Sequence, residues 1–352
     1  MSVFTSFDDG MAKEALNKVK FVYISRKIKE GNRRGNHSIK DILVFSYAAF
    51  LHRHKIQNFD LVILDSIHYF YPFLLLRSFK RLNVRVVTIF YEAWYEYRMS
   101  GAVSSMLSYF MGIYIKRLIS YSDKIISVSD QTTESLITNY KVNKDMVVTI
   151  PLGIDYDNIK AQYPFKNFTD RSYDLVFVGR FAAIKRVDDI VDAVSILVKK
   201  GTKIEVALIG DGPRKKLIEQ KIKKLGLDKI FHIFGFLSAN DKYSTLANSK
   251  IFSLPSEREG FSLSTLEGMA LGCIPIVSRP KYVEVFGVSH FVKDGENGIY
   301  YSVGNVDELA QSISKCLDNL EKSKLMSLNA LETSKYYTIN NMAKKIYETL
   351  PV

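Results

Sequence analysis

A repeated alternation between short apolar runs and longer stretches with helical periodicity constrains the fold of this 352-residue chain more than any other feature. The runs are rich in Val, Ile, Leu and Phe. Strands buried on both faces of a parallel sheet have this composition, and the segments between the runs are long enough for crossover helices. In the first half of the chain, the predicted strands are residues 20–25, 60–66, 84–90, 124–129 and 147–152.

The alternation pauses at residues 153–173, which contain Gly, Pro, Asn and Asp, and then resumes. A chain of this length exceeds the size at which one hydrophobic core normally keeps growing, so two domains are expected. We predict an α/β fold of two doubly wound, Rossmann-like domains that face each other across a cleft, with ligands at the carboxyl ends of the strands. The strands predicted in the second half are residues 174–179, 203–210, 231–236, 251–256 and 274–278.

The predicted boundaries follow from the same pattern. The first domain covers residues 1–152, the linker 153–173 and the second domain 174–335. Residues 336–352 are expected to form a C-terminal helix that crosses back to the first domain.

The formal net charge of +12 is concentrated in the first half, where residues 1–150 contain 21 Lys and Arg against 13 Asp and Glu. The densest basic stretch, residues 26–40, is compatible with a solvated loop, an anionic lipid surface or an acidic substrate. Nucleic acid is disfavoured, because no helix-turn-helix, zinc-finger or aromatic RNA-binding signature accompanies the charge. The aromatic and Met-rich residues 94–121 are typical of a core helix and also of a helix at an anionic membrane surface.

The chain is expected in the cytoplasm, with peripheral contact at the membrane face as a second hypothesis. No run of about 18 apolar residues suggests a membrane span, and the N-terminus lacks a secretory pattern. Cys273 and Cys316 are too few for a disulfide framework and lie in apolar surroundings, so both are predicted to be reduced core residues.

The segment SEREGFSLSTLE, residues 256–267, follows a predicted strand and enters a predicted helix. Gly260 permits close backbone approach, and the helix N-terminus favours a phosphate. The carboxylates of Glu259 and Glu267 can each accept two hydrogen bonds from a sugar diol, so the pattern suits a nucleoside diphosphate sugar. Two structural alternatives are open: Ser264 to Glu267 also reads as a capping box, and Glu259 could be a solvated turn residue paired with Arg258 or Arg180.

The sequence PSEREGFSLSTLEGMALGCIPIVS, residues 255–278, resembles the signature of family 4 of the retaining glycosyltransferases. Members of that family have the two-domain GT-B fold and two glutamates separated by seven residues, a spacing that Glu259 and Glu267 share. The likeness covers residues 124–348 and is poor over the first 120. Further matching segments, in the family's order, are residues 150–155, 178–194, 209–219, 234–238 and 294–313.

The resemblance implies a role for each matching position. Glu259 would contact hydroxyls of the donor sugar, and Glu267 the ribose. Arg180 and Lys185 would clamp the diphosphate and stabilise charge on the leaving group, a form of electrostatic catalysis, although Arg180 could instead be a surface ion-pair partner. The other implied donor-binding residues are Phe236 and Leu237 near the base, and Gly260, Phe261, Ser262 and Leu263 along the sugar and phosphates.

The first domain departs from the family pattern, because its usual Gly-Gly loop is missing. Where the family often has a histidine, this chain has Tyr91 and Glu92, and Tyr91 cannot act as a general base near neutral pH. His68, at the end of another predicted strand, is the alternative candidate on the acceptor side. A lone histidine is more often a satisfied structural residue, and that alternative is open.

The resemblance implies a retaining transfer of a sugar from a nucleotide diphosphate donor to a hydroxyl of a glycan or lipid-linked acceptor, in cell-envelope polysaccharide or glycoconjugate synthesis. Front-face attack, in which the departing phosphate takes the acceptor proton, needs no protein base. We predict no cofactor and no divalent metal, because the Asp-x-Asp at 155–157 lies in the linker. A sugar-nucleotide epimerase of the same fold and a catalytically silent donor-binding subunit are the alternatives.

Overall fold

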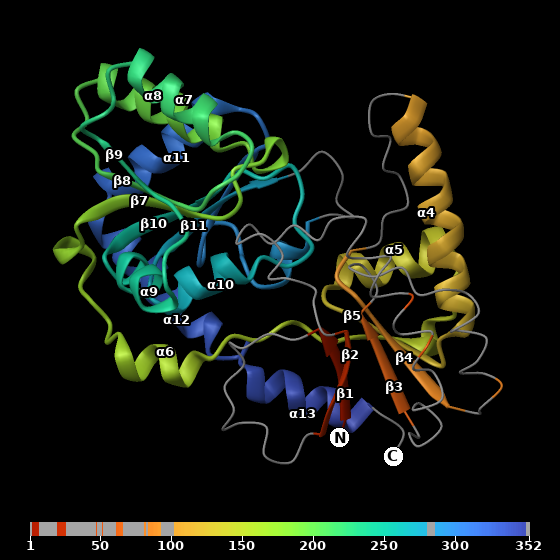
Figure 1. The fold of residues 1–352 in the computed structure, drawn as a ribbon. Helices are drawn as coiled ribbons and strands as arrows, with labels where there is room; N and C mark the ends of the chain where they lie inside the picture. The colour runs from red at the N-terminus through yellow and green to blue at the C-terminus, as the bar shows by residue number, and fades with distance from the viewer. Residues whose placement is uncertain are drawn as a thin grey trace. The chain divides into compact units, whose positions relative to one another are not determined.

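The computed structural model describes residues 2–6, 20–25, 47, 51, 61–65, 81, 84–92, 102–279 and 286–349. The chain divides into two compact units, which Figure 1 shows and which are treated separately below. The first unit contains residues 1–127 and 135–148. The second contains residues 128–134 and 149–352.

The first unit has a parallel strand pair and a four-stranded sheet of order β3-β4-β5-β6. Within that sheet the pairs β3–β4 and β4–β5 are parallel. Apolar side chains of β4, β5 and the end of α4 form one buried cluster, because the strands carry β-branched residues toward the helices. The elements are β1 (Ser2–Ser6), β2 (Lys20–Ser25), β3 (Leu61–Asp65), β4 (Arg85–Phe90), α4 (Ala102–Tyr121), β5 (Lys124–Ser127), α5 (Asp130–Tyr140) and β6 (Val147–Thr149).

The second unit is built on a six-stranded parallel sheet of order β12-β11-β10-β7-β8-β9. Helices α7, α8 and α11 cover one face, and α9, α10 and α12 cover the other (Figure 1). The strands are β7 (Tyr173–Val178), β8 (Val206–Ile209), β9 (Phe231–Phe234), β10 (Ser249–Leu254), β11 (Ile274–Arg279) and β12 (Ile299–Ser302).

The helices of this unit are α6 (Tyr156–Gln162), α7 (Val187–Lys199), α8 (Lys215–Lys224), α9 (Ala239–Ala247), α10 (Leu263–Ala270), α11 (Val306–Asp318), α12 (Leu320–Ser334) and α13 (Ile339–Thr349). From β7 to α10 strands and helices alternate, as the sequence pattern predicts. Apolar residues of α7, α8, α11 and α12 enclose a large core around β7, β8 and β11.

The predicted α/β class is confirmed, and each predicted strand is present as one of β2 to β11. Strands β1 and β12 were not predicted. Helix α13 lies within the expected C-terminal helix, and its crossing to the first domain stays a prediction.

Both cysteines are buried and free, as predicted. Burial raises the pKa of each thiol, Cys273 and Cys316, to about 12, so both stay protonated and unreactive at neutral pH.

Candidate functional site

The order of strands in the second unit identifies where a ligand can bind. From β7 the chain proceeds through β8 to β9 on one side and then returns to β10 on the other. This reversal is the topological switch point, and open α/β sheets bind ligands outside the carboxyl ends of the strands there. The loops that follow β7 and β10 meet at this point, where the Glu257 N–H donates to the Ile184 carbonyl at 2.9 Å.

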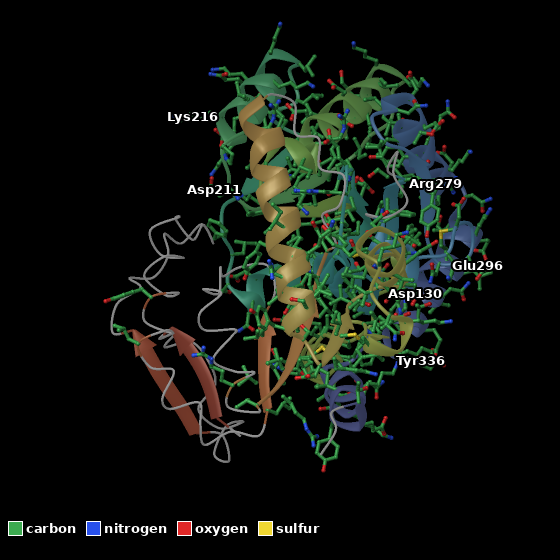
Figure 2. The ribbon with its side chains drawn as sticks, turned by 90° about the vertical axis from the view of Figure 1, so that its right-hand side faces the viewer. Asp130, Asp211, Lys216, Arg279, Glu296 and Tyr336 are labelled. Atoms are coloured by element: carbon green, nitrogen blue, oxygen red, sulfur yellow. The ribbon has the colours of Figure 1, made fainter. Side chains whose placement is uncertain are left out.

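Two glycines allow the loop after β8 to pack directly on the loop after β7. A Cβ atom on Gly210 would lie 1.9 Å from the carbonyl oxygen of Gly179, and one on Gly212 would lie 2.4 Å from that of Phe181. The Phe181 N–H donates to the carbonyl of Asp211, which Figure 2 labels, at 2.8 Å. This backbone contact fixes the residues on either side of Arg180.

Arg180 is the second residue after the end of β7, and it is exposed. No ion pair that joins two of the described residues involves Arg180. The alternative role as a surface ion-pair partner is therefore wrong for the part of the chain that the structure describes. The guanidinium remains available to an anion at the end of the sheet.

Lys185 and Glu259, which the sequence assigns to two different parts of a donor, are in direct contact. The Lys185 Nζ donates to Glu259 Oε1, and the Ser256 hydroxyl donates to the same oxygen at 2.7 Å. The Glu259 side chain is only 12% exposed and that of Lys185 is 26% exposed. Glu259 is thus not a solvated turn residue, and its ion pair among the described residues is with Lys185 rather than with Arg258 or Arg180.

Glu267 lies in the second turn of α10 and faces α9. Its two carboxylate oxygens each accept a hydrogen bond from the Lys242 Nζ at 2.7 Å, and Oε1 also accepts one from the Tyr243 hydroxyl at 3.0 Å. Sequence reasoning missed both donors. They belong to no motif, and they are 25 and 24 residues away from Glu267 along the chain.

The capping-box alternative for Glu267 is wrong. Helix α10 begins at Leu263, so Ser264 lies inside the helix rather than before it. The N-cap residue is Ser262, which has a left-handed backbone with φ 70° and no side-chain capping hydrogen bond. The Glu267 carboxylate is therefore not committed to the helix terminus.

The start of α10 combines an anchored side chain with available amides. Phe261 is buried, and its ring packs 5.1 Å from that of Phe291 and 6.2 Å from that of Tyr337. Within the described residues, no acceptor takes a hydrogen bond from the backbone N–H groups of residues 260–265. The ring of Phe261 thus fixes the loop, and the N–H groups with the helix dipole suit an anion.

Phe236 and Leu237 follow β9. Phe236 is 56% exposed and Leu237 is half-buried. Both precede Ser238, whose hydroxyl caps α9 by accepting from the Asp241 N–H at 3.1 Å. The predicted base-binding residues therefore lie next to the helix that carries Lys242 and Tyr243.

On the acceptor side, Tyr91 and Glu92 directly follow β4 and are half-buried. His68 and the basic stretch 26–40 lie outside the described residues. In the described part of α4, Tyr114, Ile115 and Leu118 are buried in the core, which supports the core-helix interpretation for that part.

Among the described residues, no three or more His, Cys, Asp or Glu side chains are grouped so that they could hold a metal ion. None of the helices in the described ranges has the length and hydropathy that a membrane span requires.

Two family models match the chain in succession. The model described as Glycosyltransferase Family 4 matches residues 1–158, and the model described as Glycosyl transferases group 1 matches residues 159–333. The second match includes Arg180, Lys185, Glu259 and Glu267.

This chain is similar in sequence to curated proteins and in fold to solved structures. An uncharacterised glycosyltransferase of Methanocaldococcus jannaschii is 30% identical over 60% of this chain and 55% of its own length. The MMP alpha-(1->4)-mannosyltransferase of Mycolicibacterium hassiacum is 28% identical over 58% of this chain and 47% of its own. The chain thus spans about half the length of these curated relatives. A crystal structure of Anabaena HepE in complex with UDP superposes with a TM-score of 0.69 at 16% identity, over 94% of this chain and 85% of that one.

Proposed function

Since this chain belongs to the group 1 glycosyltransferases of family 4 and has the GT-B fold, we propose that it transfers a sugar from a nucleotide diphosphate sugar to a hydroxyl group, with retention of the anomeric configuration. The acceptor in this proposal is a glycan or a lipid-linked sugar of cell-envelope polysaccharide or glycoconjugate synthesis. The donor occupies the switch point of the second unit.

The contact between Lys185 and Glu259 is the observation that supports this proposal most directly. A nucleotide sugar joins a hydroxyl-rich ring to a diphosphate through one bond, so its site needs an acceptor of hydroxyl hydrogen bonds beside a cation. Glu259 supplies the carboxylate and Lys185 the ammonium, at the switch point of one sheet. Arg180 and the N-terminus of α10 add positive charge on the diphosphate side.

The proposed chemical step breaks the bond between the sugar C1 and the oxygen of the leaving diphosphate. The acceptor oxygen forms its new bond to C1 on the same face, and its proton passes to an oxygen of the departing diphosphate. No protein base is required. Lys185 and Arg180 stabilise the negative charge that develops on the leaving group, and Glu259 orients the sugar through its hydroxyls.

A screen of nucleotide sugars by thermal shift, followed by product analysis, tests the proposal. A ligand at 100 times its Kd should stabilise the protein by about 2.7 kcal/mol. NMR of the product formed with a sugar-alcohol or lipid-linked acceptor should show the anomeric configuration of the donor. An inverted product would contradict the retaining mechanism, and an epimerised donor formed without acceptor would indicate an epimerase instead.

A further inference from the structure

The carboxylate of Glu267 is held by two consecutive residues of a neighbouring helix. Lys242 and Tyr243 lie in the first half of α9, and both side chains reach across to α10. The Lys242 Nζ also lies 4.4 Å from the centroid of the Tyr243 ring, and that ring packs 5.9 Å from the ring of Tyr163. Each donor is therefore fixed by further contacts, and the carboxylate is oriented before any ligand arrives.

The hydrogen bonds leave Glu267 with little spare capacity. An ionised carboxylate offers about four acceptor positions, two on each oxygen. On each oxygen, the inner position is the one nearer the other oxygen and the outer position is the one farther from it. Lys242 contacts both oxygens at the same distance of 2.7 Å, so it takes the inner position on each, and Tyr243 takes the outer position of Oε1. One position remains, on the outer side of Oε2.

The pair is also well shielded, with exposed side-chain fractions of 14% for Glu267 and 22% for Lys242. Burial and the nearby Glu267 charge raise the pKa of Tyr243, so its hydroxyl stays protonated and donates a hydrogen bond at any physiological pH. A vicinal diol that bonded to both oxygens would have to displace the ammonium from the position it now fills.

We infer that Lys242 and Tyr243 are positioning residues that restrict Glu267 to one ribose hydroxyl, which donates its hydrogen bond to Oε2. The inference rests on the proposed function, because it assumes that a nucleotide binds at this site. It makes the ribose contact selective: removal of one of the two hydroxyl groups weakens binding, whereas removal of the other does not.

Calorimetric titration of the full chain with deoxynucleotides tests this. UDP, GDP and ADP are first compared by melting temperature, and the nucleotide that stabilises most is titrated beside its 2′-deoxy and 3′-deoxy forms. In the parent protein, one deoxy form should bind about tenfold more weakly than the other. In Lys242→Met and Tyr243→Phe that difference should disappear, and Lys242→Arg should restore part of it.

Lys250→Met is a matched control. Lys250 pairs with Asp174 at 2.7 Å, with exposed fractions of 21% and 16%, but it lies at the opposite end of the strands. This variant should keep the parent's ratio of the two deoxy dissociation constants, even if its melting temperature falls as much as that of Lys242→Met.

Each other outcome overturns a defined part of the argument. Equal weakening of both deoxy forms in the parent would mean that the diol displaces Lys242 and that the inference is wrong. An unchanged ratio in both variants would reduce Lys242 and Tyr243 to a structural role. If the nucleotide and both deoxynucleotides bind equally well, Glu267 does not contact the ribose and the inference is wrong, but the proposal that the site binds a nucleotide donor is unaffected. Failure of every nucleotide to bind would overturn the proposed function itself.

Discussion

The contact of Lys185 with Glu259 places a cation that can serve the diphosphate against the carboxylate that can serve the sugar. We therefore expect Lys185→Met and Arg180→Met each to lower turnover by about 10²-fold or more, because each removes positive charge that stabilises the leaving group. Steady-state kinetics with the donor found by thermal shift measures this. Lys221→Met is the control, since Lys221 is 30% exposed and pairs with Asp192 at 2.5 Å, between α8 and α7. Near-parent turnover in both site variants would exclude them from catalysis.

The two glutamates should respond differently to the same change. Glu267→Gln loses the charge that makes its hydrogen bonds strong, so it should weaken nucleotide binding at least about tenfold, equivalent to about 1.4 kcal/mol. Its melting temperature should shift by a few degrees at most, because glutamine keeps the shape of the side chain and one acceptor oxygen for Lys242 and Tyr243. Glu259→Gln should reduce turnover more than nucleotide affinity, because its proposed partner is the sugar. Calorimetry beside melting curves distinguishes them, and parent-like nucleotide affinity in Glu267→Gln would contradict the ribose assignment.

At the scale of helices and loops, the donor site depends on backbone packing that sequence motifs only partly reveal. The glutamate pair and the Arg180–Lys185 segment could be predicted, because residue types and spacing alone define them. Lys242 and Tyr243 could not, since their relation to Glu267 exists only when α9 and α10 pack together. The capping box failed for a local reason: the helix starts at Leu263, with Ser262 in a left-handed conformation that the sequence does not signal.

The close approach at Gly210 provides a test of this packing. Gly210→Ala should destabilise the protein by at least about 3 kcal/mol, because its Cβ would lie 1.9 Å from the Gly179 carbonyl oxygen. Gly226→Ala is the control, because Gly226 has a positive φ of 69° but open space around it, so it should cost only about 1 kcal/mol. Denaturant unfolding measures both. Equal costs would show that backbone conformation, not loop contact, explains the effect.

For the whole molecule, alternation of buried strands and helices was enough to predict an α/β fold of two units. Strand β12 escaped prediction because Ile299–Ser302 contains two tyrosines after a Gly- and Asn-rich turn, and β1 because Ser2–Ser6 is too short and polar to read as a buried run. Short edge strands carry a weak periodic signal.

Charge neutralisation by side chains leads to a prediction about metal dependence. If Arg180, Lys185 and the terminus of α10 neutralise the diphosphate, transfer should persist in the presence of EDTA. The measurement compares initial rates with EDTA, with magnesium and with manganese. Complete loss in EDTA that either metal restores would require a metal ion in the step, and the cationic clamp would then be secondary.

The positive net charge of the whole protein predicts that it binds anionic membranes. At pH 7 the formal charge is +12, and Lys116 and Arg117 are exposed on α4, on the turn beside its buried face. We expect binding to vesicles that contain anionic lipid at low ionic strength, because a basic surface gains about 1 kcal/mol per Lys or Arg close to such a membrane. The bound fraction should fall steeply as salt is raised, since the Debye length shortens from about 10 Å at 0.1 M to about 3 Å at 1 M. Vesicle co-sedimentation measures it, with neutral vesicles of the same size as the control. Binding that persists at 1 M salt would indicate that apolar side chains insert into the membrane instead. If no binding occurs at low salt, the membrane hypothesis is wrong, and the basic residues contact solvent or an acidic acceptor.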